Sequence, residues 1–163
     1  MIQEDLTPEL CDHFGDALSV LHPGLKSFGG VQAFVGEVVT VKAFEDNSLV
    51  REWVAKPGLG RVLVVDGGGS MRRAMLGDML AAKAVDNGWQ GIVIHGCIRD
   101  CQAIAKMPLA VFALATHPMK TEKLGAGQSE VPVQIQGVWV KPGDWLAGDP
   151  NGVVVSAQCL VIS

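Results

Sequence analysis

Three short apolar segments alternate with helical patterns in the middle of the chain, and this order restricts the fold more than any other feature. Residues 61–66 and 91–96 are rich in Val and Ile, and residues 109–115 are similarly apolar. Between the first two, residues 78–87 have the Ala, Leu, Met and Lys content of a helix, which Asn87-Gly88 can end. Apolar strands joined by helices are typical of parallel βαβ units.

The flanking segments predict further strands, which form antiparallel hairpins in the last third of the chain. Residues 34–44 are rich in β-branched side chains, and residues 131–140 alternate between apolar and polar. Turn sequences at 142–144 and 149–152 lead into the apolar residues 153–155. We therefore expect a single domain over residues 1–163, with an α/β fold and a mixed, partly barrel-like sheet.

Shorter patterns predict the remaining elements. Leucine and phenylalanine recur every three or four positions from Leu6 to Leu21, which predicts an amphipathic helix that ends by His22-Pro23-Gly24. Residues 99–106 are expected to form a short helix. Residues 50–54 are expected to form a short extended or helical piece.

The composition restricts the partners and the compartment. The chain has 13 basic and 17 acidic side chains, a formal charge of −4 and no block of Lys or Arg, so we expect no direct binding to nucleic acid. Residues 1–5 lack the features of a secretory signal, and the longest apolar runs are far shorter than the roughly 20 residues that span a bilayer. We expect a cytoplasmic protein without membrane contact, whose four cysteines are reduced thiols.

Gly77-Asp78 and Arg99-Asp100 stand out because the predicted elements bring them together. A helix over 78–87 rises about 15 Å at roughly 1.5 Å per residue, and a strand over 91–97 returns about 20 Å at roughly 3.3 Å per residue. The start of the helix and the end of the strand should therefore lie at one edge of the sheet. Open α/β sheets bind ligands at that edge.

These residue types suit a metal-assisted reaction of a 2-oxo acid. Free amides at a helix N-terminus, here those of residues 77–80, bind carboxylate or phosphate, and Arg99 offers a forked donor for a carboxylate or enolate oxygen. Asp78 and Asp100 would favour a hard cation such as Mg²⁺ or Mn²⁺. A structural interpretation stays open, because Asp is common in the first helical turn and Arg-Asp pairs are common on surfaces.

Three other motifs have weaker patterns. Gly67-Gly68-Gly69-Ser70 resembles a phosphate cradle but lacks the Gly-Lys-Ser/Thr of a Walker loop. His95 could act as a base, although a lone His in an apolar run is more often part of the core. Cys97 and Cys101 lack the further ligands, at motif spacing, of a structural zinc site.

Two stretches resemble a known family. VDGGGSMRRAMLGDMLAAKAVDNGWQGIVIHGCIRD, residues 65–100, closely resembles the central signature of the regulator of ribonuclease activity A family, which includes the class II 4-hydroxy-4-methyl-2-oxoglutarate aldolases. GVWVKPGDWLAGDPNGVVV, residues 137–155, is similar to its closing hairpin segment. The resemblance implies a swivelling β/β/α fold and a homotrimer with sites between subunits. It also implies either aldolase activity or regulation of a ribonuclease.

The resemblance implies a role for each residue at the predicted site. Aldolase members carry an Asp followed, after twenty residues, by Arg-Asp, and this chain matches with Asp78, Arg99 and Asp100. By this likeness Asp100 binds the divalent metal directly, Asp78 holds it through water, and Arg99 contacts pyruvate. The pyruvate carboxylate is held by the amides of Gly77, Asp78, Met79 and Leu80.

The implied chemistry passes through a pyruvate enolate, which the metal and Arg99 would stabilise. It cleaves 4-hydroxy-4-methyl-2-oxoglutarate to two pyruvates and decarboxylates oxaloacetate to pyruvate. The acidic residue that the family's aldolases place shortly after Arg-Asp is Ala103 here, and no acidic residue follows Asp149 to match the C-terminal Glu of longer aldolases. Since decarboxylation requires no deprotonation of an alcohol, we expect it at least as readily as aldol cleavage.

Two interpretations compete with the catalytic one. The chain could be a non-catalytic regulator that binds and inhibits an RNA-degrading endonuclease, with its acidic surface against basic segments of that partner. It could also be a folded paralogue that keeps the metal site and has no physiological substrate.

Overall fold

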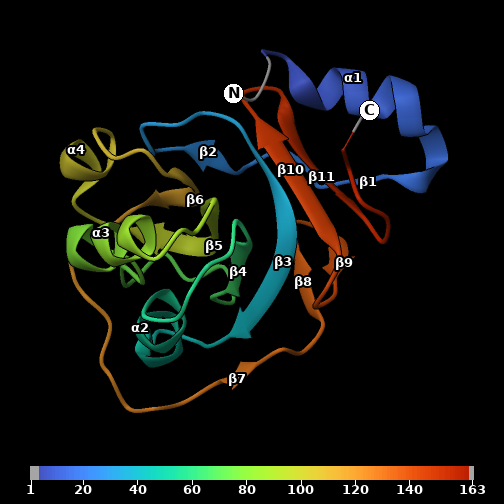
Figure 1. Ribbon diagram of the computed structural model, residues 1–163. Coiled ribbons are helices and arrows are strands. Elements are labelled where there is room, and N and C mark those ends of the chain that lie inside the picture. Colours follow the sequence, from blue (N-terminus) through green and yellow to red (C-terminus); the bar gives the residue numbers. More distant parts are fainter. Residues whose placement is uncertain (1–3, 162–163) are drawn as a thin grey trace.

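One strongly curved sheet organises the fold, and the computed structural model describes it within residues 4–161 (Figure 1). The helical elements are α1 (Leu6–Phe14), a 3₁₀ turn (Gly15–Ala17), α2 (Ser48–Val54), α3 (Asp78–Asp86) and α4 (Cys101–Ile104). The strands are β1 (Ser19–Val20), β2 (Lys26–Ser27), β3 (Phe34–Lys42), β4 (Val62–Asp66), β5 (Gly91–Ile98), β6 (Ala110–Thr116), β7 (Gln128–Ser129), β8 (Val133–Ile135), β9 (Val138–Val140), β10 (Trp145–Asp149) and β11 (Gly152–Ser156).

Four parallel strands form the centre of the sheet, in the order β3-β4-β5-β6. Helix α3 connects β4 to β5, and α4 connects β5 to β6, so the predicted βαβ units are confirmed. Helices α2, α3 and α4 lie on one side of these strands, and the strands β8 to β11 lie on the other (Figure 1).

The central strands are buried on both faces because successive side chains point in opposite directions. On β4, Leu63 and Val65 pack into the cluster that includes Ala81 and Ala84 of α3, whereas Val62 and Val64 pack into a second cluster beneath the hairpins. This accounts for the continuous apolar run in the sequence. The carboxyl edge of the parallel strands is thereby fixed between two cores.

The sheet curls because β3 pairs with a different strand along each half of its length. Its second half, from Val38, pairs in parallel with β4, and its first half pairs antiparallel with β10. Gly148 of β10 lies opposite Phe34, where an added Cβ would clash with the Phe34 ring. Strands β11 and β1 continue this half, so the prediction of a mixed, partly barrel-like sheet within the swivelling fold is confirmed.

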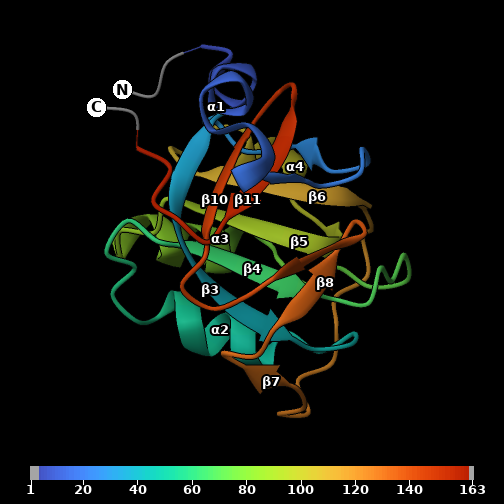
Figure 2. The same cartoon turned by 90° about the vertical axis from the view of Figure 1, so that its right-hand side faces the viewer.

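The predicted N-terminal helix is shorter in the structure. Helix α1 ends at Phe14, because Gly15 adopts a left-handed φ of 55°. Leu18 follows the 3₁₀ turn, and Leu21 lies in the cluster beneath the hairpins. Figure 2 shows α1 over the end of the β10–β11 hairpin, away from α2 and α3. The expectation of one helix to residue 21 is therefore wrong, although Leu6, Leu10 and Leu21 are buried and Leu18 is partly buried.

The structure shortens one predicted element and decides the form of another. The helix expected over residues 99–106 is reduced to Cys101–Ile104, because Asp100 has a left-handed φ of 59° that no helical residue adopts. The ambiguous segment at residues 50–54 is helical, as part of α2. Within the described part of the chain, no helix has the length and apolar character needed to cross a membrane.

Candidate functional site

The end of β5 and the start of α3 meet at the carboxyl edge of the parallel strands. The backbone amide of Arg99, directly after β5, donates to the carbonyl of Leu76 at 2.9 Å. The amide of Asp78, the first residue of α3, donates to Oδ2 of Asp100 at 2.9 Å. Asp78 and the Arg99-Asp100 pair therefore lie together, as the lengths of the helix and the strand predict.

The segment before α3 holds this arrangement in place. Ala74 forms β-bridges both with Cys97 of β5 and with Lys120 in the segment after β6. The amide of Met75 donates to the carbonyl of Cys97 at 2.9 Å. Residues 74–76 thus run alongside the end of β5 and deliver Gly77 to the Asp100 carboxylate.

Asp100 and Gly77 make the closest approach of the site. Asp100 has φ 59° and ψ 38°, a conformation that few residues other than glycine adopt and that Asp tolerates better than most. A Cβ on Gly77 would lie 2.7 Å from Oδ2 of Asp100. Only glycine at residue 77 therefore allows the carboxylate to reach the amide of Asp78.

The first turn of α3 presents amides of two kinds. The amide of Asp78 is already used by Asp100. The amides of Gly77, Met79 and Leu80 have no acceptor among residues 4–161, because the first amides of a helix lack an intrahelical partner. The expectation that all four amides face a ligand thus needs a correction, since three are available and the fourth orients a carboxylate.

A cavity of about 340 Å³ opens at this point. All the predicted site residues line it, and five basic side chains stand around the two carboxylates. The lining residues are Asn47, Arg51, Ala74, Gly77, Asp78, Met79, Leu80, Lys83, Arg99, Asp100, Lys120 and Lys123. With five cations and two anions the wall carries a formal charge of +3, whereas the whole chain carries −4.

Five lining residues were missed by the sequence analysis: Asn47, Arg51, Lys83, Lys120 and Lys123. Asn47 and Arg51 are four positions apart on one side of α2, a spacing that indicates a shared face but not a cavity. Asn47 is 7% exposed, and its Oδ1 has no donor among the described residues. A buried acceptor beside a cavity is suited to a hydroxyl or a water molecule.

Asp46 fastens the outer wall of the cavity. It is 2% exposed, and its carboxylate accepts hydrogen bonds from the Ser48 hydroxyl and amide at 2.6 and 2.9 Å and from the amides of Leu124 and Ala126 at 2.9 and 3.0 Å. Burial raises the pKa of Asp46, but these hydrogen bonds outweigh it and lower the pKa from 3.8 to about 2. The charged carboxylate thus ties the segment after β6 to the start of α2.

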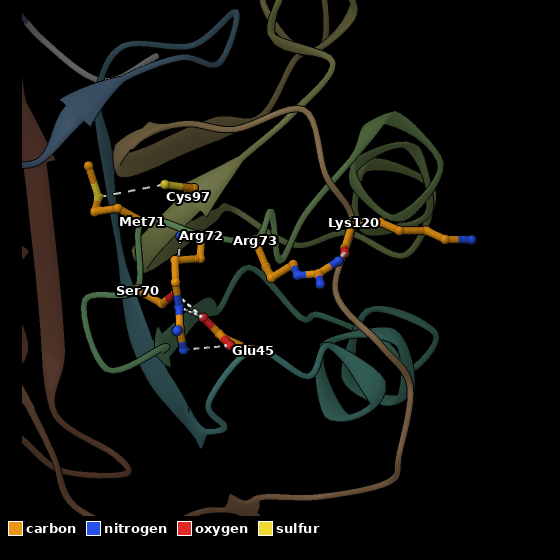
Figure 3. A network of polar contacts seen from close by, with 7 residues as sticks. All are labelled: Glu45, Ser70, Met71, Arg72, Arg73, Cys97 and Lys120. Carbon is orange, nitrogen blue, oxygen red and sulfur yellow. Dashed lines mark hydrogen bonds and ion pairs between the residues drawn. The ribbon is translucent and has the colours of Figure 1, made fainter.

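A second polar network supports the segment before α3 (Figure 3). Glu45 accepts from the Ser70 hydroxyl at 2.6 Å and forms an ion pair with Arg72 at 2.8 Å, and these two contacts lower its pKa. Arg73 donates to the carbonyl of Lys120 at 3.2 Å. Figure 3 shows the Lys120 side chain pointing away from this network.

The glycine-rich loop is used for structure. The amides of Gly67 and Gly69 donate to the carbonyl of His95 at 3.1 and 3.0 Å, and the amide of Gly68 donates to Asp66 at 2.9 Å. Because these amides already have acceptors, the loop cannot offer them to a phosphate. Its resemblance to a phosphate cradle therefore has no functional counterpart in the geometry.

His95 lies outside the cavity lining, between two other side chains. Its Nε2 is 3.1 Å from Oε1 of Gln136, and its Nδ1 is 3.7 Å from Oδ1 of Asp66, a distance that suits an ion pair rather than a hydrogen bond. Asp66 raises the pKa of His95 most, burial opposes this effect, and Gln136 raises the pKa further by a smaller amount. The interpretation as a partnered core residue fits this geometry better than that of a base.

The two cysteines of the C-x3-C pattern lie in different environments. Cys97 is buried in β5, with its sulfur 3.6 Å from that of Met71, and Cys101 is exposed at the start of α4. Burial raises the pKa of the Cys97 thiol. Within residues 4–161, no three His, Cys, Asp or Glu side chains are grouped so that they could hold a metal by themselves.

Known proteins of similar sequence are named as aldolases. A protein of Pseudomonas paraeruginosa (strain DSM 24068 / PA7) named "Putative 4-hydroxy-4-methyl-2-oxoglutarate aldolase" is 57% identical over 155 residues, which cover 95% of this chain and 96% of that protein. A protein of the same name from Azotobacter vinelandii is 56% identical, with coverage of 95% and 96%.

Two solved structures of high similarity carry other names. A Geobacillus kaustophilus protein described as an S-adenosylmethionine:2-dimethylmenaquinone methyltransferase has a TM-score of 0.91 and 46% identity, over 93% of this chain and 94% of that one. The RNA-processing inhibitor RraA from "Thermus thermophilis" has a TM-score of 0.92 and 42% identity, over 96% and 94%. Similarity alone does not select among these activities.

The family itself is identified by the sequence profile described as "RraA-like: Aldolase/RraA", which matches residues 7–155. This range contains the four central parallel strands, which pack into both core clusters, and every residue that lines the cavity. The chain therefore belongs to the RraA-like family.

Proposed function

We propose that the protein is a divalent-metal-dependent lyase that cleaves 4-hydroxy-4-methyl-2-oxoglutarate to two pyruvates and decarboxylates oxaloacetate to pyruvate. The observation that carries this proposal is the Asp100 carboxylate, which is held against the N-terminus of α3 in the same cavity as Arg99. The names of the similar aldolases agree with it.

The donor set fits a hard cation. Oδ2 of Asp100 accepts from the Asp78 amide, and its other oxygen and the Asp78 carboxylate have no protein donor among the described residues. Mg²⁺ commonly binds one or two carboxylates and takes its other ligands from substrate and water. We propose that Asp100 holds Mg²⁺ or Mn²⁺ directly and Asp78 holds it through water. When bound, such an ion supplies Lewis-acid stabilisation of negative charge on the 2-oxo group.

The chain's own residues would bind and orient the substrate. The amides of Gly77, Met79 and Leu80 would hold the carboxylate of the 2-oxo acid, with the positive end of the α3 dipole behind them. Arg99 would contact the 2-oxo oxygen, on which negative charge develops as the C–C bond breaks. Arg99 is half-buried, and its Nη1 lies 3.4 Å from the Pro118 carbonyl, which holds the side chain over the cavity.

The two reactions make different demands on the site. Aldol cleavage requires a base for the alcohol proton, and Ala103 on α4 cannot supply one. Decarboxylation releases carbon dioxide without that step. We therefore propose that oxaloacetate is decarboxylated at least as readily as the aldol substrate is cleaved.

Pyruvate release tests the proposal. It is measured from each substrate with Mg²⁺ or EDTA, corrected for the metal-catalysed background, for wild type, Asp100→Ala and the control Asp86→Ala, which removes an exposed carboxylate at the other end of α3. We expect activity only with metal, a loss of at least about 100-fold in Asp100→Ala, and an unchanged control. Wild type at background with every metal would refute the enzyme.

A second function is favoured by the similarity to the RNA-processing inhibitor RraA. If wild type is inactive, binding to an RNA-degrading endonuclease becomes the leading hypothesis. Asp100→Ala distinguishes the two functions, because a regulator should still bind its partner after this substitution. We also propose a homotrimer with sites between subunits, as the family resemblance implies, and sedimentation velocity measures this assembly.

A further inference from the structure

The cavity holds more positive charge than a single carboxylate requires. Arg99 and the α3 amides suffice for the pyruvate half of a substrate. Arg51 of α2 and Lys83 of α3 also line the cavity, and among residues 4–161 neither side chain has an ion pair or a hydrogen bond. Cations that share a cavity repel one another, and the two carboxylates of the cavity leave an excess positive charge of +3 on its wall. This excess points to a second anionic group in the ligand.

The two helices that carry these cations are fixed relative to the predicted metal site. Lys83 follows Met79 by four positions on α3, so both residues lie on the face that borders the cavity. Arg51 follows Asn47 by four positions on α2, and the backbone amide of Arg51 donates to the Asn47 carbonyl at 3.0 Å. Helices α2 and α3 are packed through one core, which contains Val54 and Ala84.

The cavity has the size and polarity for a small diacid. Its volume of about 340 Å³ lies at the lower end of the roughly 300–1,000 Å³ that is usual for small-molecule sites. The unpartnered Oδ1 of Asn47, which lies in the same wall, can accept a hydrogen bond from a hydroxyl group or from water that accompanies the ligand. A monoacid such as pyruvate would leave Oδ1 of Asn47 and the cationic side chains of Arg51 and Lys83 without a partner.

We propose that Lys83 and Arg51 bind the second carboxylate of the substrate and make the site selective for 2-oxo diacids over 2-oxo monoacids. This inference rests on the proposed function, because it places the first carboxylate and the 2-oxo group at α3 and Arg99. Lys120 and Lys123 border the same cavity from a segment without regular structure and raise its positive potential.

The two substrates use the second carboxylate differently. In 4-hydroxy-4-methyl-2-oxoglutarate it stays on the carbon that becomes the second pyruvate, while the electron pair of the broken C–C bond enters the enolate and a base takes the hydroxyl proton. In oxaloacetate the same carboxylate leaves as neutral carbon dioxide. Lys83 and Arg51 therefore stabilise the ground state of oxaloacetate more than its transition state, and their removal should raise both KM and kcat for oxaloacetate.

Equilibrium binding gives a test that does not depend on turnover. The probes are 2-oxoglutarate and 2-oxopentanoate, which have the same chain length and differ in the second carboxylate, each titrated calorimetrically with Mg²⁺ present. The variants are Lys83→Gln, Arg51→Gln and the charge-conserving Lys83→Arg. The control is Lys141→Gln, which removes the charge of an exposed lysine that does not line the cavity.

We expect wild type to bind 2-oxoglutarate at least tenfold more tightly than 2-oxopentanoate. Lys83→Gln and Arg51→Gln should each weaken 2-oxoglutarate binding by about tenfold and 2-oxopentanoate binding by less than twofold. Lys83→Arg and Lys141→Gln should keep the preference. Equal affinity of wild type for the two acids, or a preference that survives both Gln variants, would overturn the inference. Lyase activity at background with the binding preference intact would refute only the proposed reaction.

Discussion

Replacing Asp46 by Asn tests how the cavity wall is held. The carboxylate accepts four hydrogen bonds, two from Ser48 and one each from Leu124 and Ala126. Asn keeps one oxygen as an acceptor and directs an NH₂ group at amides that need an acceptor. The variant should therefore lose both the charge and part of the hydrogen bonding, without a large change in volume.

The depressed pKa of Asp46 gives the size of the charge effect. A fall from 3.8 to about 2 corresponds, at about 1.4 kcal/mol per pH unit, to about 2 kcal/mol of folding free energy at pH 7. Because the folded pKa is below the unfolded one, this contribution is present above pH 3.8 and is lost as the pH falls through about 2. About 1 kcal/mol should remain at pH 3. The unpartnered amides add a cost of about 1–3 kcal/mol that does not depend on pH.

Urea unfolding followed by tryptophan fluorescence measures both parts, at one protein concentration and at several pH values from 7 to 3. We expect the difference in unfolding free energy between wild type and Asp46→Asn to shrink by about 1 kcal/mol over this range. A difference that is constant with pH would show that the charge of Asp46 contributes nothing. If wild type and Asp46→Asn have the same unfolding free energy at pH 7, the hydrogen bonds of Asp46 do not stabilise the fold and the reasoning is refuted.

Two further substitutions separate the site from the fold. Gly77→Ala should keep the unfolding free energy within about 1 kcal/mol of the wild-type value, because residue 77 has an ordinary extended backbone. Its Cβ would displace Asp100 and should reduce the proposed lyase activity about 100-fold. Urea unfolding and pyruvate release, measured on the same preparations, test both expectations. His95→Gln should remove a pH-dependent part of the stability. The raised pKa of His95 stabilises the wild type fully below 6.5, and this stabilisation is lost as the pH rises through the folded pKa. If the difference in unfolding free energy between wild type and His95→Gln is the same at pH 6 and at pH 8, this expectation is wrong.

The parallel half of the fold could be predicted because its signals are local. Residues 62–65 form an uninterrupted apolar run within one strand, and residues 78–86 form a helix with an acidic residue in its first turn. Helix and strand lengths then place Asp78 beside Asp100 without any knowledge of tertiary contacts. The grouping of Asp78, Arg99 and Asp100 at that edge was predictable for the same reason, since all three belong to one βαβ unit.

The end of the N-terminal helix and the cavity walls could not be predicted, for different physical reasons. Leucine spacing from Leu6 to Leu21 suits a helix, but one left-handed glycine at residue 15 ends it and redirects Leu21 into another core. The wall residues Arg51 and Lys123 come from segments that meet α3 only through long-range packing and the Asp46 anchor. No pattern within either segment indicates a cavity.

The anchoring of the wall links stability to the site. Residues 117–127 contain no regular element, and Thr121 is their only buried residue. Polar contacts hold them instead, from Ala74 to Met119 and Thr121, from Arg73 to Lys120, and from Asp46 to Leu124 and Ala126. A segment held by a few hydrogen bonds opens at a lower free energy than one buried in a core. Since Lys120 and Lys123 move with it, weakening Asp46 should loosen the positive wall before the parallel strands unfold, so ligand affinity should fall under conditions in which the sheet is still intact.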